Sequence, residues 1–179
     1  AGDRSANANL LDSGTLYAAR FNADGSGEWL PLVQGQGGLV AGAVDPGNVT
    51  QGPQPATTID FLSQADVLLN TKAAARVVGA TLMDRPEWIS VAPDRHGSTT
   101  PTNNSSRQVT DAASPRPQNR HGHIVRWREV GESPAARRFS WELIVQAGDA
   151  TLANAAGNLV GNIVGDTFSS PDGIGVDPA

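Results

Sequence analysis

The segment Met83-Asp84-Arg85-Pro86-Glu87-Trp88 holds the side chains best suited to chemistry in this sequence. A proline disfavours the helical region for the residue before it, so we expect extended geometry at Arg85. Side chains two positions apart on an extended segment leave on the same face. Arg85 could then bind a phosphate with its planar guanidinium while Glu87 ligates a cation. An ordinary Arg–Glu surface pair at the start of a strand explains the same local pattern.

Further oxygen donors for a cation occur later in the chain. Asn103 and Asn104 carry neutral amide oxygens, and Asp172 carries a carboxylate within a Ser-Pro-Asp-Gly turn. Oxygen ligands of these kinds suit hard cations such as calcium. Taken singly, each of the three residues is also typical of turns.

Two other groups of residues have weaker chemical signals. His121 and His123 would present two imidazoles on one face of an extended segment, but no third metal ligand is evident nearby, so ordinary histidines at a strand start are favoured. Six arginines between Arg116 and Arg138 are opposed only by Glu129 and Glu132. This basic zone could attract phosphate esters, and a solvated strand edge explains it equally well.

Length and composition limit the classes of function. The 179 residues correspond to one domain or to a piece of a larger one. The net charge of −5 and the single lysine, Lys72, disfavour a nucleic-acid binder. The absence of cysteine excludes disulfides and thiolate metal sites, and no apolar run has the ~18 residues of a membrane span. The chain lacks an initial Met and a signal peptide, which predicts a processed protein or a part of a longer one.

The elements that would position these residues are mostly strands. Residues 14–21 and 28–33 predict a β-hairpin, residues 88–91 a short strand, and residues 123–128 and 139–145 a second strand pair. Such hairpins need a stacked or radial neighbour, as in a propeller blade or a sandwich, to bury both faces.

The segments between the strands are expected to be loops, with one helical insertion around residues 60–79. Apolar spacing predicts two helices there, capped by Thr58 or Asp60 and by Thr71. Residues 34–56 show no periodicity and predict a loop. Residues 94–120 predict a long polar loop. A central strand is not expected around Pro101, because proline has no N–H to donate to the strand ladder.

Six segments, taken in order, resemble the PhoX-type alkaline phosphatases. They are Gly14–Leu32, Asp66–Thr71, Met83–Ile89, Thr102–Asn104, Gly122–Glu129 and Ser170–Gly173. The resemblance extends over nearly the whole chain. It implies a β-propeller with inserted helices, here a mainly β fragment of one, in an exported periplasmic or extracellular protein of a kind commonly sent by the twin-arginine route.

The resemblance also implies an activity and roles for residues. Members of the family hydrolyse phosphate monoesters with iron and calcium. By this resemblance Arg85 is the phosphate-binding arginine, Glu87 a metal-ligating glutamate and Asp172 another ligand, while Asn103 or Asn104 lines the same pocket.

The chain departs from the family in length and in one ligand. Family members are far longer, and their upstream cysteine ligand to iron has no counterpart in a chain without cysteine. We therefore expect residues 1–179 to be one fragment of a larger propeller domain, inactive alone and completed by the missing remainder of the parent chain. The alternative is a non-catalytic propeller segment that acts as a binding or scaffold module.

Overall fold

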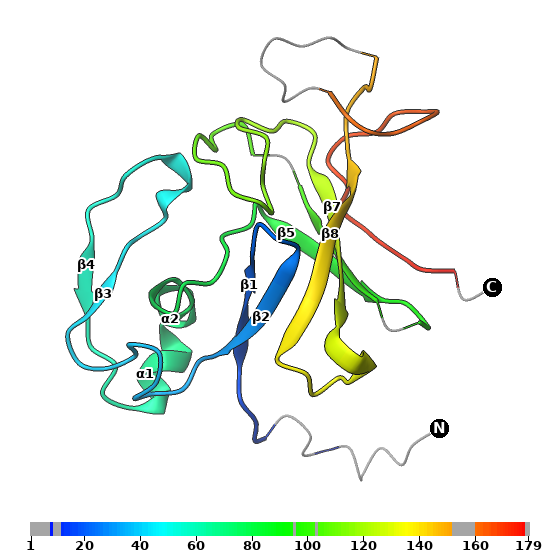
Figure 1. Cartoon of the computed structure of the whole chain (residues 1–179). Coiled ribbons are helices and arrows are strands. Elements are labelled where there is room, and N and C mark those ends of the chain that lie inside the picture. The colour runs from blue at the N-terminus through cyan, green and yellow to red at the C-terminus, as the bar shows by residue number, and fades with distance from the viewer. Residues whose placement is uncertain (1–7, 9–11, 95, 103, 152–159, 178–179) are drawn as a thin grey trace.

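A single curled antiparallel sheet dominates the structure. The computed structural model describes residues 8, 12–94, 96–102, 104–151 and 160–177. Within them, six strands pair in the order β1-β2-β8-β7-β6-β5. Figure 1 shows this sheet with most of its strands labelled. The strands are β1 (Tyr17–Phe21), β2 (Ser26–Pro31), β5 (Pro86–Val91), β6 (Gly97–Pro101), β7 (His123–Glu129) and β8 (Arg138–Gln146). The predicted mainly β class is confirmed.

Both predicted strand pairs form, and they share one sheet. β1 and β2 make the N-terminal hairpin, whose turn is held by Asp24, because its Oδ1 accepts the Ser26 N–H at 2.9 Å. β7 and β8 pair over their length, and β2 continues the sheet by pairing with β8. Segments more than 100 residues apart in the sequence therefore lie side by side.

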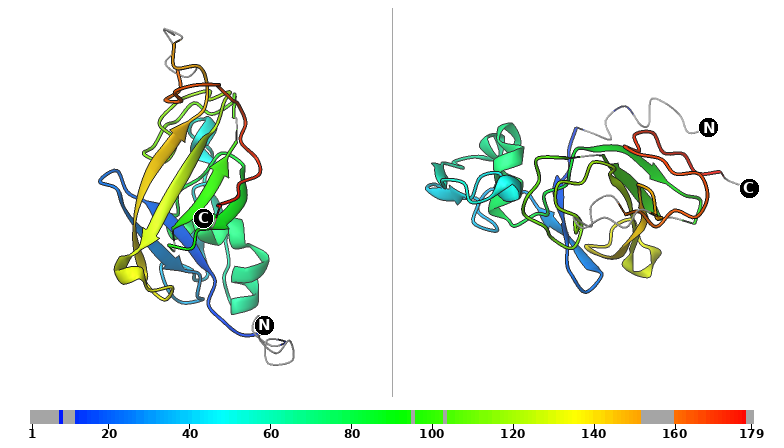
Figure 2. Two further views of the ribbon diagram at one scale, coloured as in Figure 1. Left: turned by 90° about the vertical axis from the view of Figure 1, so that its right-hand side faces the viewer. Right: turned by 90° about the horizontal axis from the view of Figure 1, so that it is seen from above.

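Aromatic side chains pack across this sheet. Phe139 on β8 contacts Phe21 and Trp29, each with 5.1 Å between ring centroids. Trp29 in turn meets Trp127 edge-on at 6.1 Å. Ring pairs at such spacings stabilise beyond the area they bury. Rings from β1, β2, β7 and β8 thus hold strands together that are not all neighbours, and the sheet curls, as the view from above in Figure 2 shows.

A small helical layer lies beside β1 (Figure 1) and has its own core. It contains α1 (Gln64–Leu69), α2 (Thr71–Val77) and the two-stranded pair β3 (Ala43–Asp45) and β4 (Thr57–Ile59). The fully buried side chains of Phe61 and Val67 belong to this core.

The two helices form where predicted, but the N-terminal caps of both differ. Thr71 is the first helical residue of α2, and Asn70 stands at its N-cap position. Ser63, not Thr58 or Asp60, caps α1 in a capping box with Asp66. Thr58 lies in β4, because its segment pairs with β3. The strand pairing therefore delays the start of the helix.

Two predicted loops contain regular structure. Residues 34–56 include β3 and the 3₁₀ turn η1 (Val49–Gln51), and a second such turn, η2 (Val130–Glu132), follows β7. Within residues 94–120, β6 pairs with both β5 and β7 and is buried at all five positions. Its small side chains let neighbouring residues pack closely, and Pro101 lies at the strand end opposite Pro86, where a missing N–H costs least. No strand or helix covers residues 104–120.

No helix in the described part of the chain has both the length and the apolar composition that crossing a bilayer requires.

The close approach of Trp127 to Gly97 provides a test of the sheet packing. A Cβ at Gly97 would lie 2.3 Å from Cε2 of Trp127, so Gly97→Ala should lower the free energy of unfolding by about 1–3 kcal/mol through overpacking. Chemical denaturation of the purified protein measures the change. Gly14→Ala is the control, since nothing lies within 4 Å of its Cβ position, and equal stability of the two variants would contradict this packing.

Candidate functional site

Arg85 stands at the entrance to β5 with an exposed side chain. Its φ is +46°, so the prediction of extended geometry at Arg85 is wrong. A non-glycine residue in this left-handed region is uncommon and must be held by its surroundings. Here Thr102 supplies the contact, because its N–H and its hydroxyl both reach the Arg85 carbonyl, at 3.3 and 3.4 Å.

Glu87 lies in β5 and is also exposed. The pairing of β5 with β6 shifts register between Pro86 and Ile89, so Glu87 lies in an irregular stretch of an edge strand. Together with the left-handed Arg85, this shift means that simple strand alternation does not determine the directions of the two side chains.

Asp172, which is 85 positions beyond Glu87, is brought back to the same strand. Its carbonyl accepts a hydrogen bond of 2.6 Å from the Thr100 hydroxyl, which itself accepts the Trp88 N–H at 3.3 Å. A Cβ at Gly173 would lie 3.9 Å from the Trp88 ring. The Asp172 turn thus packs against the residue that follows Glu87.

The same turn is anchored on the chain that leads into β7. Ser170 donates its N–H to the His121 carbonyl at 2.7 Å, and the Ser169 hydroxyl lies 3.0 Å from Nδ1 of His121. Gly122 permits this approach, since its φ is +75° and a Cβ there would lie 3.1 Å from Cδ of Pro171 and 2.7 Å from the Pro101 carbonyl oxygen. Gly122 also ends the extended geometry that would have aligned His121 with His123.

Of the two asparagines proposed from the sequence, only Asn104 lies among the described residues. Asn103 lies outside the described residues. Asn104 donates its amide N–H to Asp84 Oδ1 at 2.8 Å, while its amide oxygen accepts the N–H and the hydroxyl of Ser106 at 3.1 and 2.8 Å. Both the nitrogen and the oxygen of the Asn104 amide therefore make hydrogen bonds to neighbouring residues of the fold.

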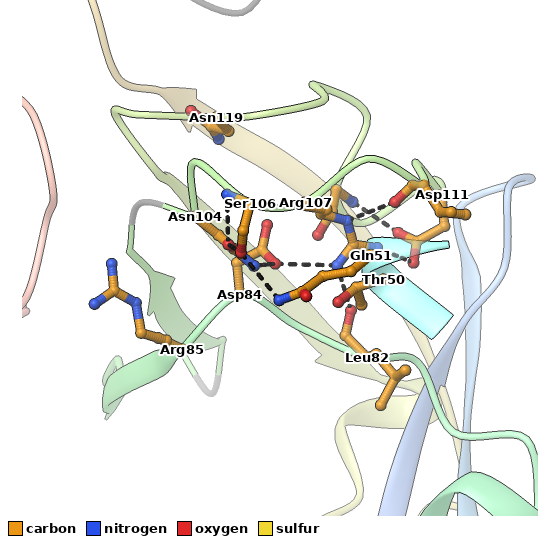
Figure 3. A network of polar contacts seen from close by, with 12 residues as sticks. Thr50, Gln51, Leu82, Asp84, Arg85, Asn104, Ser106, Arg107, Asp111 and Asn119 are labelled. Atoms are coloured by element: carbon orange, nitrogen blue, oxygen red, sulfur yellow. Dashed lines mark hydrogen bonds and ion pairs between the residues drawn. The ribbon is translucent and has the colours of Figure 1, made fainter. Parts of the chain in front are cut away.

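Asn104 belongs to a buried polar network that the sequence did not reveal (Figure 3). Its centre is Arg107, which is only 2% exposed. Arg107 donates to the Leu82 carbonyl at 3.0 Å, to Asp84 Oδ1 at 3.1 Å and to Asp111 Oδ2 at 2.7 Å. The i,i+4 spacing of Arg107 and Asp111 was the one local signal, but the decisive partner, Asp84, is 23 residues away.

Arg85 lies outside this network, although it follows Asp84 directly. In Figure 3 its side chain points away from Arg107 and its partners. The network therefore holds the backbone on the Asp84 side of Arg85.

Two arginines of the arginine-rich zone bind other groups of the protein. Arg116 is buried and donates to the carbonyls of Ala147 and Val160 at 2.8 and 3.0 Å. Arg126 pairs with Glu142 at 2.6 Å, across neighbouring strands. These arginines largely hold the fold together.

His123 is a buried, neutral histidine. Burial, reinforced by the charge of Arg116, lowers the pKa of His123 to about 4. Among the described residues, no three acidic or histidine side chains come together as a metal-binding group. Glu87 and Asp172 remain two exposed carboxylates on packed neighbouring segments.

Comparison with known proteins identifies the class of this fold. The family model described as alkaline phosphatase PhoX matches residues 1–179, and the chain belongs to this family. Among solved structures, the chain is similar to Pseudomonas fluorescens PhoX in complex with vanadate, a transition state analogue, with 39% identity and a TM-score of 0.78. The match covers 97% of this chain and 30% of that one, so the chain spans about a third of its relative's length. No curated protein matches.

The lowered pKa of His123 predicts a pH-dependent stability. In the unfolded chain His123 binds a proton below its ordinary pKa of 6.5, whereas in the folded chain it stays neutral down to about pH 4. The contribution of His123 to the free energy of unfolding is therefore fully present above pH 6.5. It is lost as the pH falls through this window, by about 3 kcal/mol at most. Denaturation of wild type and His123→Gln between pH 7 and 4.5 should show the steeper loss in wild type. Parallel curves would contradict a buried neutral imidazole.

Proposed function

We propose that this chain supplies part of the phosphate- and metal-binding site of a metal-dependent phosphomonoesterase. One observation carries the proposal: the Thr100 hydroxyl joins the Asp172 turn to β5, the strand that contains Glu87 and directly follows Arg85. Family membership adds support, since the similar Pseudomonas protein binds vanadate, a transition state analogue. The substrates would be phosphate monoesters, and the parent protein would act outside the cytoplasm.

Arg85 would bind the phosphate. A guanidinium offers parallel N–H donors that match two phosphate oxygens, and it keeps its charge at any physiological pH. The side chain is exposed and directed away from the buried network, so it can reach a ligand. As negative charge builds on the transferring phosphoryl group, this fixed positive charge stabilises the transition state more than the ground state.

Glu87 and Asp172 would hold a metal ion. Both carboxylates are exposed, and carboxylate oxygens are the donors that calcium prefers. Calcium takes about six to eight oxygen ligands, so two side chains make only part of a site. The rest, including every ligand for iron, would come from the remainder of the parent chain, and Asn103 is a further proposed donor here. Asn104 is proposed to line the pocket rather than to ligate, because its amide oxygen already accepts hydrogen bonds from Ser106. When bound, such metal ions would polarise the phosphate oxygens and activate the attacking oxygen.

The role of Arg85 is tested by a charge-conserving substitution in the full-length protein. Arg85→Lys keeps the charge but loses the planar pair of donors, so kcat/KM for a phosphate monoester should fall by about a hundredfold or more. Arg126→Lys is the matched control, because Arg126 is paired with Glu142 on the strands at the middle of the sheet. Unchanged turnover in Arg85→Lys would remove Arg85 from the site.

The metal-binding role is tested by thermal denaturation of the full-length protein with calcium. At a free concentration a hundred times the dissociation constant, binding should stabilise the folded protein by about 2.7 kcal/mol. Glu87→Gln should reduce the shift in melting temperature, whereas Glu142→Gln, the same change on an exposed side chain of β8, should not. If wild type shows neither a calcium-dependent nor an iron-dependent shift and no turnover, the non-catalytic binding or scaffold segment is the better account.

A further inference from the structure

Thr100 occupies a junction between segments that are distant in the sequence. It lies in β6 and is fully buried, with 0% of its surface exposed. Its hydroxyl accepts the Trp88 N–H at 3.3 Å and donates to the Asp172 carbonyl at 2.6 Å. One oxygen atom is therefore hydrogen-bonded to the backbone of Trp88, which follows Glu87, and to the backbone of Asp172.

Regular strand pairing does not fix the relative placement of these two segments. Regular pairing between β5 and β6 is interrupted between Pro86 and Ile89, which is where Glu87 lies. The Asp172 turn belongs to neither a helix nor a strand, and its anchor at Ser170 is to the chain before β7, not to β5. The Thr100 hydroxyl connects the Asp172 carbonyl to β5 by hydrogen bonds.

We propose that Thr100 is a positioning residue that sets the distance between the Glu87 and Asp172 carboxylates. This inference rests on the proposed function. Because Thr100 is buried, it acts through the backbone at Trp88 and Asp172 and does not touch substrate. Small displacements of groups that must converge on one reacting centre cost much of the rate.

The neighbouring residue offers a matched comparison. Thr99 lies in the same strand and is also buried, at 8% exposed, but in the described part of the chain its hydroxyl makes no hydrogen bond to another residue. Thr99→Val and Thr100→Val thus make the same chemical change at adjacent buried positions. They differ in whether a bridging hydroxyl is lost.

The test compares Thr100→Val, Thr100→Ser and Thr99→Val in the full-length protein. We expect Thr100→Val to lower kcat for a phosphate monoester about tenfold to a hundredfold, with a smaller change in KM. The inhibition constant for vanadate should rise by the same factor as kcat/KM falls. Thr100→Ser, which keeps the hydroxyl, and Thr99→Val should both stay near wild type.

Several outcomes would overturn the inference. It is wrong if Thr100→Val keeps wild-type kcat and vanadate inhibition, or if Thr99→Val or Thr100→Ser loses as much as Thr100→Val. If Thr100→Val does not fold, Thr100→Ala removes the same hydroxyl without filling its space and carries the same comparison. If Arg85→Lys loses turnover while Thr100→Val keeps full turnover, the inference about Thr100 is wrong but the proposed function stands. Full turnover in Arg85→Lys would instead count against the proposed function.

Discussion

The buried ion pair between Arg107 and Asp84 anchors the backbone immediately before Arg85 and β5, and the candidate site depends on that anchor. Both side chains are about 2% exposed. A buried charge is costly unless it is paired and hydrogen-bonded, and removing one member of such a pair typically costs about 3–5 kcal/mol. Arg107 also bonds to the Leu82 carbonyl and to Asp111, so a single guanidinium joins residues 82, 84, 107 and 111. The residue that follows Asp84 is Arg85.

β6 completes the arrangement from the other side. It lies between β5 and β7 and is buried throughout, although its sequence is Gly-Ser-Thr-Thr-Pro. Two of its residues make different contacts. Gly97 leaves room for the Trp127 ring, and the Thr100 hydroxyl forms hydrogen bonds with β5 and with the Asp172 turn. A buried polar side chain in this strand is tolerated where its hydroxyl is hydrogen-bonded to backbone groups, as that of Thr100 is. This strand links the proposed phosphate-binding arginine to the proposed metal ligands.

Local patterns were sufficient to predict the hairpins, the helical insertion and the mainly β class, because alternating and helical spacings reflect burial directly. They failed at β6, since Ser, Thr and Gly carry no apolar alternation and the strand exists only through its partners. They also failed for Arg107, whose partner Asp84 is 23 residues away. At Arg85 the extended geometry expected from the following proline was wrong, because the residue adopts a left-handed conformation whose carbonyl accepts contacts from Thr102. The side chains proposed for the site were found from residue type and resemblance, whereas their placement depends on contacts that no local pattern contains.

The most direct test of the account is a crystal structure of the full-length protein with bound orthovanadate. The account predicts that both terminal nitrogens of Arg85 lie within hydrogen-bonding distance of vanadate oxygens, about 2.7–2.9 Å. It also predicts Glu87 and Asp172 on metal ions beside the same anion. Vanadate bound elsewhere, with the Arg85 guanidinium in bulk solvent or turned from Glu87 and Asp172, would contradict it.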